Sequence, residues 1–391
     1  MPLIDYRLRT RIVAGENAIE NLGALAKEYG GRRVLVVSDP GVVAAGIYDR
    51  GCDSIRGKGL EFFGFHRLSE NPTTDHVADG LAVAKEFRPD LIVGLGGGSS
   101  MDCAKGINFL YSCGGSMSDY WGVGKATAPM LPLIAVPTTA GTGSETQSFA
   151  LISDAATHVK MACGDPKAAA CVAILDPKLT LTQPPRVTAL TGIDALTHAL
   201  ETYVSSKRNA VSECFSREAW SLLSRGFPRV IEDPSDLAGR TQMQLGAAFA
   251  GMAIEASMLG AAHALANPLT AILGVPHGQA VGMMMPHVVR FNQSVVEHRY
   301  RELVHLLPEV SHEDRRPSSV VVAERFTNWL LLSGMSIRLV DLPRWNHQWS
   351  SADVEAKLSE LAEMATKQWT GGFNPRVATP EEYLQIYRDS L

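Results

Sequence analysis

The sequence predicts two domains: an α/β domain with a parallel sheet over residues 1–183, and an all-helical domain over residues 184–391. A chain of 391 residues is too long for one ordinary hydrophobic core. The first half alternates short apolar runs with helical segments, which is typical of parallel strands covered on both faces. The second half shows helical patterns and few strand signals. The pair Pro184-Pro185 suits neither a helix interior nor a central strand, and therefore marks the boundary.

Three buried strands are expected in the first domain, at residues 33–39, 91–95 and 133–136. Each is a nearly continuous apolar run, as expected for a strand buried on both faces. A helix is expected between the first two strands, over residues 76–87. Residues 6–13 have the pattern of an edge strand.

The second domain is expected to consist of helices, because its apolar residues recur at helical spacing. The segments are residues 187–204, 210–227, 240–266 and 318–332.

Charge and composition exclude several classes of protein. The net charge of -5, from 36 basic and 41 acidic residues, argues against nucleic acid as the main partner. No apolar run approaches the roughly 20 residues that span a bilayer, and the N-terminus has no apolar signal-peptide core. We expect a cytoplasmic protein without a membrane partner. Its six scattered cysteines form no C-x-x-C pair and are expected to be small buried apolar residues.

Two loops at strand ends suggest a nucleotide site. Residues 96–100, Gly-Gly-Gly-Ser-Ser, follow a strand and open a helix whose N-terminus can hold phosphate. Alone, the triplet fits a plain tight turn equally well. Residues 137–145 form a second loop, rich in Thr and Gly, after the next strand. Loops at the carboxyl ends of parallel strands converge on the crevice where open α/β sheets bind ligands, so together they predict nucleotide binding.

Four side chains of the second domain suit a metal ion. Asp194 and His198 are four residues apart and share one helix face, although such a pair fits a surface contact equally well. His263 lies in an apolar stretch, where a lone histidine is more often a core residue, and His277 lies in a Val-Pro-His-Gly loop. Together, three imidazoles and a carboxylate make a coherent shell for Fe(II) or Zn(II).

Long motifs extend these indications. They are GGGSSMDCAKGI (96–107), PLIAVPTTAGTGSE (132–145), ILDPKLT (174–180), TGIDALTHALE (191–201) and GVPHGQAVGMMMPHVVRFN (274–292). In this order they resemble the iron-containing (group III) alcohol dehydrogenase family, of dehydroquinate synthase-like fold, over essentially the whole chain. The resemblance implies a dinucleotide-binding domain followed by a helical catalytic domain. It also implies that Asp194, His198, His263 and His277 are the metal ligands and the catalytic site.

The resemblance further implies where the cofactor binds. The matching positions are Asp39, Asn71, Gly97, Gly98, Ser99, Asp102, Thr138, Thr139, Thr142, Gln147, Phe149, Lys160 and Leu179. A carboxylate at the adenosine ribose accepts hydrogen bonds from a free 2′-hydroxyl and repels a 2′-phosphate, so Asp39 favours NAD over NADP. The family commonly dimerises through its N-terminal edge strand, and we therefore expect a homodimer joined by residues 6–13.

Three positions depart from the family pattern. Asn267 stands where many relatives carry a proton-relay histidine, and an amide cannot exchange protons near neutral pH. Gln147 replaces a cofactor-contacting Thr, and Ile254, which with Asn267 is expected to line the substrate pocket, would give that pocket a non-aromatic wall. These differences affect the substrate more than the type of reaction.

The expected function is that of a metal-dependent, NAD-linked alcohol dehydrogenase or aldehyde reductase. Hydride would pass between nicotinamide and a metal-bound small alcohol or carbonyl. A hydroxyacid–oxoacid transhydrogenase, or a hydroxy acid or semialdehyde dehydrogenase, is an alternative. A non-catalytic protein that binds NAD and metal is an alternative of another class, supported by Asn267.

Overall fold

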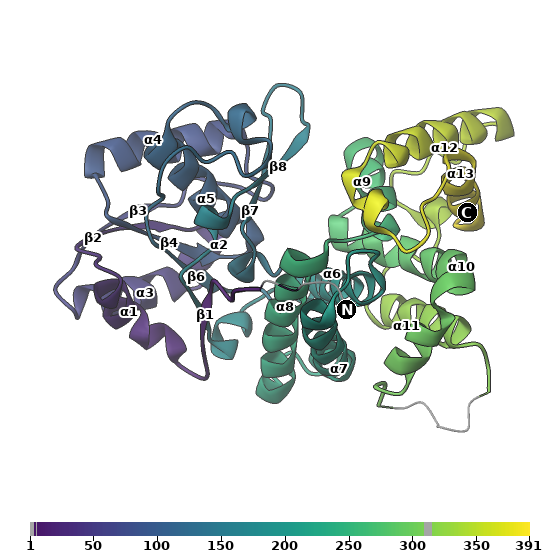
Figure 1. The fold of residues 1–391 in the computed structure, drawn as a ribbon, viewed down its shortest axis with the longest axis horizontal. Coiled ribbons are helices and arrows are strands. Elements are labelled where there is room, and N and C mark those ends of the chain that lie inside the picture. The colour runs from purple at the N-terminus through teal and green to yellow at the C-terminus, as the bar shows by residue number, and fades with distance from the viewer. Residues whose placement is uncertain (1–3, 5, 309–314) are drawn as a thin grey trace. The chain divides into compact units, whose positions relative to one another are not determined.

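The computed structural model describes residue 4, residues 6–308 and residues 315–391. The chain divides into two compact units, Met1–Gln183 and Pro184–Leu391 (Figure 1). Each unit is described by itself.

The first unit is built on a six-stranded sheet in the order β1-β9-β6-β4-β2-β3, with every neighbouring pair parallel. Its strands are β1 (Arg11–Ala14), β2 (Arg33–Val37), β3 (Glu61–Phe65), β4 (Leu91–Gly96), β6 (Leu133–Pro137) and β9 (Val172–Leu175). A smaller sheet joins β5 (Gly122–Val123), β8 (Lys160–Gly164) and β7 (Phe149–Ser153). The predicted parallel α/β sheet is therefore confirmed.

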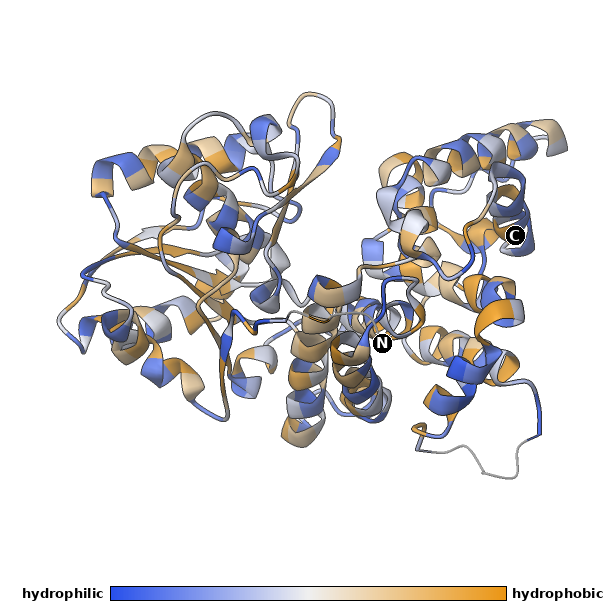
Figure 2. Ribbon diagram, viewed as in Figure 1, coloured by the Kyte–Doolittle hydropathy of each residue, from blue (hydrophilic) through white to orange (hydrophobic). Residues whose placement is uncertain are grey.

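Helices cover both faces of the large sheet (Figure 1). They are α1 (Leu22–Glu28), α2 (Pro40–Ala44), α3 (Ile47–Arg56), α4 (Thr74–Phe87) and α5 (Gly98–Cys113). Alternate residues of β2 point to different cores: Val34 and Val36 pack with α1 and α3, whereas Leu35 and Val37 pack with α4 and α5. Because both faces are buried, the strands are apolar throughout, as Figure 2 shows.

The regular structure of the second unit, over its described residues, is helical. Its α-helices are α6 (Pro185–Val204), α7 (Ala210–Glu232), α8 (Leu237–Ser257), α9 (Ala261–Leu273), α10 (His277–Val304), α11 (Ser318–Leu332), α12 (Ser351–Thr366) and α13 (Pro380–Asp389). A helical C-terminal unit was predicted, and this is confirmed.

Two details of the prediction were wrong. Residues 240–266 do not form one helix: α8 ends at Ser257, and α9 runs at 106° to it. The break lies at Met258, whose positive φ of 65° is incompatible with a continuing helix. The edge strand is also shorter than predicted, because β1 begins at Arg11 and pairs only four residues with β9.

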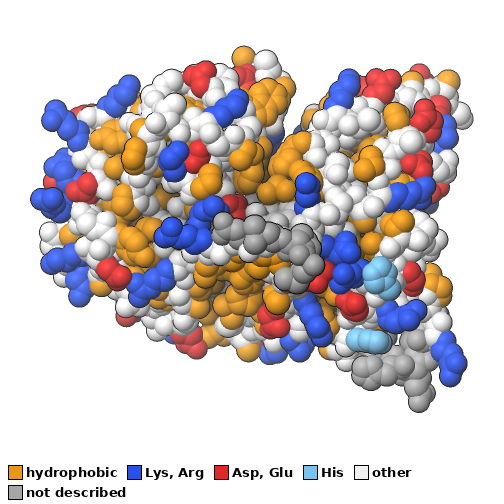
Figure 3. All heavy atoms as spheres, in the orientation of Figure 1, with side chains coloured by type: hydrophobic (Ala, Val, Ile, Leu, Met, Phe, Trp, Pro, Cys, Tyr) orange, Lys and Arg blue, Asp and Glu red, His pale blue; other side chains and the backbone are white. Residues whose placement is uncertain are grey.

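The surface agrees with the composition, but the cysteines were predicted to be buried and only Cys52, Cys103 and Cys163 are. On the face drawn in Figure 3, basic and acidic side chains are intermixed. All six cysteines are free thiols, and Cys214 is the exposed one. In the described part of the chain no single helix is long and apolar enough to cross a membrane, and α8 with α9 passes that test only as a sharply bent pair.

Candidate functional site

Helix α6 supplies the first two side chains of the candidate metal centre. Asp194 and His198 lie one turn apart, and both are buried. The Nε2 atom of His198 is 3.3 Å from the Oδ1 atom of Asp194. The i, i+4 spacing therefore brings both side chains to the same point on one helix face.

Two further helices complete the cluster. His263 lies in the first turn of α9, and its Nε2 atom is 3.5 Å from Oδ1 of Asp194. His277 is the first residue of α10, with Nε2 at 3.7 Å from the same oxygen. The structure thus brings together all four residues that the sequence suggested, from three helices, around one carboxylate oxygen.

The three distances from Oδ1 of Asp194 fit a bound divalent cation, and the ligand atoms of Asp194, His263 and His277 all lie within 4.8 Å of one another. Ligand atoms about 2.1 Å from a tetrahedral ion lie about 3.4 Å from one another. Oδ1 of Asp194 and Nε2 of His263 are buried without a hydrogen-bond partner in the described structure. Buried polar atoms are rarely left without a partner. A metal ion bound between these two atoms would give both of them one.

The electrostatics of the cluster also favour a cation. Burial opposes the ionisation of Asp194, but the neighbouring His198, His263 and His277 outweigh it and lower the pKa of this carboxyl well below its usual range. Asp194 is therefore an anion that faces three imidazoles, which is a suitable donor set for Fe(II) or Zn(II).

The sequence prediction missed one residue of this centre. The carboxylate of Glu201 lies 2.6 Å from Nδ1 of His263, and Glu201 is almost fully buried. A signal was present, because Glu201 follows Asp194 by seven residues and His198 by three, which places all three on one face of α6.

In the first unit, the glycine turn forms a tight cradle at the N-terminus of α5. Gly96 has φ of 153°, a conformation that side chains rarely adopt. A Cβ atom on Gly98 would lie 2.8 Å from Cγ2 of Thr142, and one on Gly97 would lie 3.3 Å from Cγ2 of Thr139. The glycines therefore let the two loops meet, as the sequence suggested.

Asp39 is held at the end of β2 by bonds to both of its oxygens. Oδ1 caps α2 by accepting hydrogen bonds from the backbone N–H groups of Gly41 and Val42, at 3.0 and 3.1 Å. Oδ2 accepts a hydrogen bond from the Ser100 hydroxyl at 2.9 Å. The carboxylate is thereby fixed beside the glycine turn.

Other predicted cofactor residues also surround this turn. The backbone N–H of Asn71 donates to Oγ of Ser99 at 3.2 Å, and Nζ of Lys160 donates to Oδ1 of Asn71 at 3.4 Å. The backbone N–H of Thr138 donates to the carbonyl of Gly96 at 3.0 Å. These contacts join four segments of the chain around the start of α5.

A second group of the predicted cofactor residues contacts protein atoms. Asp102 is buried, and it accepts hydrogen bonds from Oγ of Ser144 at 2.6 Å and from the backbone N–H of Leu151 at 3.2 Å. Gln147 donates from Nε2 to the carbonyl of Thr142 at 2.8 Å. Phe149 covers Gly164, and Leu179 is buried in the core. Their predicted contacts with a cofactor stay predictions.

The two candidate pocket residues lie in the second unit. Ile254 is buried near the C-terminus of α8. Asn267 is half-buried in α9, one turn after His263, and its Nδ2 atom donates to Oε1 of Gln368 at 3.0 Å. The amide is thus partnered by another amide, and neither group titrates near neutral pH.

Comparison with known families covers nearly the whole chain. The model for "iron-containing alcohol dehydrogenase" matches residues 9–177, and the model for the "Fe-containing alcohol dehydrogenase family, C-terminal" matches residues 188–391.

Individual relatives agree with these matches. The NAD-dependent methanol dehydrogenase of Bacillus methanolicus is 33% identical over 384 residues, 97% of both chains. The 1,3-propanediol dehydrogenase of Klebsiella pneumoniae is 32% identical over 395 residues, covering 100% of this chain and 99% of that one. Among solved structures, a 1,3-propanediol oxidoreductase superposes with a TM-score of 0.92 at 32% identity and covers both chains completely.

Proposed function

The chain belongs to the iron-containing alcohol dehydrogenase family, and from this membership we propose which residues carry its activity and on what substrate. The protein is an alcohol oxidoreductase. Our proposal is that Asp194, His198, His263 and His277 hold one divalent cation, Fe(II) or Zn(II). At this cation a small aliphatic alcohol or aldehyde would exchange hydride with NAD.

The observation that carries the proposal is that three imidazole nitrogens lie 3.3, 3.5 and 3.7 Å from one carboxylate oxygen. A divalent cation in such a site acts as a Lewis acid, which polarises a carbonyl and makes an alcohol easier to deprotonate. Imidazole and carboxylate ligands accept iron and zinc alike, so the choice between these metals is part of the proposal.

The cofactor would bind through the first unit. The backbone N–H groups at the start of α5, beyond Gly97, suit the pyrophosphate of a dinucleotide. Asp39 would accept a hydrogen bond from the ribose 2′-hydroxyl, which supports NAD rather than NADP. Bonds from Ser100 and from the α2 backbone keep this carboxylate in place before the cofactor arrives.

The substrate is proposed to be a small, uncharged alcohol. The named relatives include dehydrogenases for methanol and 1,3-propanediol. Ile254 would contribute an aliphatic wall. Because Asn267 bonds another amide, the substrate proton would leave through water or the cofactor ribose rather than through this side chain.

The test is an NAD-coupled screen of alcohols and aldehydes after loading with Fe(II) without oxygen, or with Zn(II). We expect NADH formation with short-chain alcohols. His277→Ala should lose both the metal and turnover. The control is His298→Ala, which should keep both, because His298 is an exposed histidine of the same helix. Full turnover in His277→Ala would overturn the ligand set. Turnover only with a hydroxy acid plus an oxo acid, and without added NAD, would favour the transhydrogenase instead.

Assembly and location extend the proposal. Strand β1 lies at one edge of the six-stranded sheet, where it can pair with a second copy of the chain. We infer a homodimer, for which light scattering after gel filtration is the test, and Ile12→Pro should yield monomers. Free thiols at all six cysteines suit a reducing cytoplasm.

A further inference from the structure

Glu201 joins the metal centre to the start of α9. Its carboxylate is 3% exposed and lies at the C-terminal end of α6. One oxygen, Oε2, contacts Nδ1 of His263 at 2.6 Å and accepts from the backbone N–H of Gly260 at 3.0 Å. The other oxygen accepts from the backbone N–H groups of Ala262 at 2.7 Å and His263 at 3.4 Å.

The first turn of α9 depends on two buried side chains for its hydrogen bonds. The first four N–H groups of a helix have no partner within the helix. Here Glu201 accepts three of them, and Oδ1 of Asn374 accepts the fourth, from Ala261, at 3.4 Å. In the described structure Asn374 makes no hydrogen bond to the imidazole of His263.

We propose that Glu201 is a positioning residue, which holds His263 with its proton on Nδ1 and its Nε2 lone pair directed at the cation. This inference rests on the proposed metal site. Because Nδ1 of His263 faces the carboxylate of Glu201, it acts as the hydrogen-bond donor and carries the proton. Nε2 is then the unprotonated nitrogen, and it lies beside Asp194 as the ligand atom.

Charge and burial explain why a carboxylate suits this place. A hydrogen bond to an ionised acceptor is short and strong, and the 2.6 Å separation agrees with this. The negative charge also lies at the N-terminus of α9, where the helix dipole favours it. A carboxylate that orients a metal-binding histidine also raises the basicity of the imidazole, and hence the affinity for the metal.

The matched experiment compares Glu201→Gln with Asn374→Ala. Glutamine has nearly the same volume as glutamate, but it has one acceptor oxygen where Glu201 has two. Its NH₂ group would also face an N–H donor that now bonds a carboxylate oxygen. We expect the Zn²⁺ affinity of Glu201→Gln, measured by competition with a chromophoric chelator, to fall about 10–100-fold. Asn374→Ala removes a cap from the same helix and should keep the wild-type affinity. Circular dichroism gives the folded fraction for each comparison.

A second measurement tests the tautomer of His263 in the wild-type protein first and in the variants afterwards. In zinc-loaded wild-type protein labelled with ¹⁵N-histidine, His263 should show a protonated Nδ1 whose proton resonates far downfield, because it is hydrogen-bonded to a carboxylate. Asn374→Ala should keep this signal and Glu201→Gln should lose it.

The outcomes separate this inference from the proposed function. Wild-type affinity in Glu201→Gln, equal losses in both variants, or a proton on Nε2 of His263 would overturn the positioning role. A wild-type protein that binds zinc through His277 but oxidises no alcohol would overturn the proposed function alone.

Discussion

The imidazole rings of His198 and His263 stack, with ring centroids 4.9 Å apart and planes 17° from parallel. The two residues come from α6 and α9, and their Nε2 atoms lie 3.3 and 3.5 Å from Oδ1 of Asp194. His277 approaches the same oxygen from α10. The proposed site is therefore an ordered arrangement of side chains from three helices.

Metal binding should stabilise the second unit, because the ligands are grouped in the folded state and separated in the unfolded one. At free Zn²⁺ of about 100 times Kd, the added stability is about 2.7 kcal/mol. We expect the melting temperature of the wild-type protein to rise with Zn²⁺ and to fall with a chelator. His198→Ala should remove most of this response, and His298→Ala should keep it. An equal response to Zn²⁺ in wild type and His198→Ala would contradict the site.

The sequence predicted the elements whose patterns are local. Continuous apolar runs correctly indicated β2, β4 and β6, because parallel strands are buried on both faces. The i, i+4 spacing identified Asp194 and His198, since helix geometry alone brings them together.

Features that depend on tertiary contacts were missed. The break after α8 was not predicted, because helical periodicity continues through Met258 and only the fold imposes its positive φ. The role of Glu201 was missed for a similar reason: its partners, Gly260, Ala262 and His263, lie about sixty residues along the chain and meet it only after the turn. The family resemblance was needed to group His263 and His277 with the first two ligands.

The choice of NAD should depend on the charge of Asp39. Asp39→Asn keeps an oxygen that can cap α2, because Asn and Asp cap helices equally well. It removes the negative charge that would repel a 2′-phosphate. We expect the ratio of kcat/KM for NADP to that for NAD to rise by roughly tenfold, equivalent to about 1.4 kcal/mol. Asp39→Gly should shift the ratio in the same direction and lower the stability slightly.

The control is Ser100→Ala, which removes the hydroxyl that bonds Oδ2 of Asp39 but keeps the charge. Its NADP/NAD ratio should stay close to that of the wild type. An unchanged ratio in both Asp39 variants would show that the carboxylate does not face the ribose.

Glu145 should make stability depend on pH. Burial raises the pKa of this carboxyl from 4.5 to about 7, against smaller opposing effects of a backbone hydrogen bond and of Lys105. The folded state therefore holds a proton that the unfolded state releases. The resulting destabilisation is absent below about pH 4.5, grows as the pH rises to about 7, and is complete above that.

Glu145→Gln removes this effect, because an amide does not ionise. We expect the variant to be more stable than the wild type at about pH 8, by up to about 3 kcal/mol, and to match it at about pH 4.5. Urea unfolding at both pH values is the measurement. A constant difference between variant and wild type across this range would mean that Glu145 titrates in the folded state as it does in the unfolded one.

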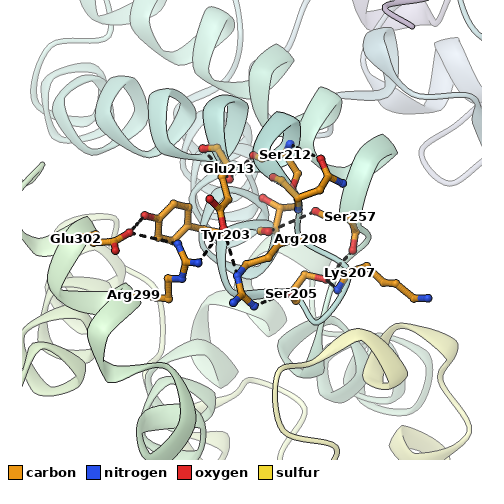
Figure 4. Close-up of polar contacts among 12 residues, drawn as sticks. Tyr203, Ser205, Lys207, Arg208, Ser212, Glu213, Ser257, Arg299 and Glu302 are labelled. Atoms are coloured by element: carbon orange, nitrogen blue, oxygen red, sulfur yellow. Dashed lines mark hydrogen bonds and ion pairs between the residues drawn. The ribbon is translucent and has the colours of Figure 1, made fainter. Parts of the chain in front are cut away.

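A polar network braces the C-terminal end of α6 (Figure 4). The buried Tyr203 donates its hydroxyl proton to Glu302 of α10. Arg299 lies over the Tyr203 ring, 5.8 Å from its centroid, and pairs with Glu213 of α7 at 3.0 Å. Arg208 pairs with the same Glu213 oxygen at 3.3 Å. The network thus ties α6, which carries Asp194 and His198, to α7 and α10.

Tyr203→Phe should lower the free energy of unfolding by about 1 kcal/mol, because it leaves the Glu302 carboxylate without this donor while the ring still packs. Glu302 is half-exposed, so water replaces part of the lost bond. We expect the Zn²⁺ affinity to stay unchanged, since the hydroxyl that is removed bonds Glu302 and Glu302 is not one of the four proposed ligands. Urea unfolding and chelator competition measure the two quantities.

A double-mutant cycle isolates the bond. In a Glu302→Gln background the effect of Tyr203→Phe should shrink, because the charged acceptor is already absent. Equal effects of Tyr203→Phe in both backgrounds would show that the hydroxyl stabilises α6 through some other group. A lowered Zn²⁺ affinity in Tyr203→Phe would instead mean that the brace extends to the ligands, since Tyr203 follows His198 by little more than one helical turn.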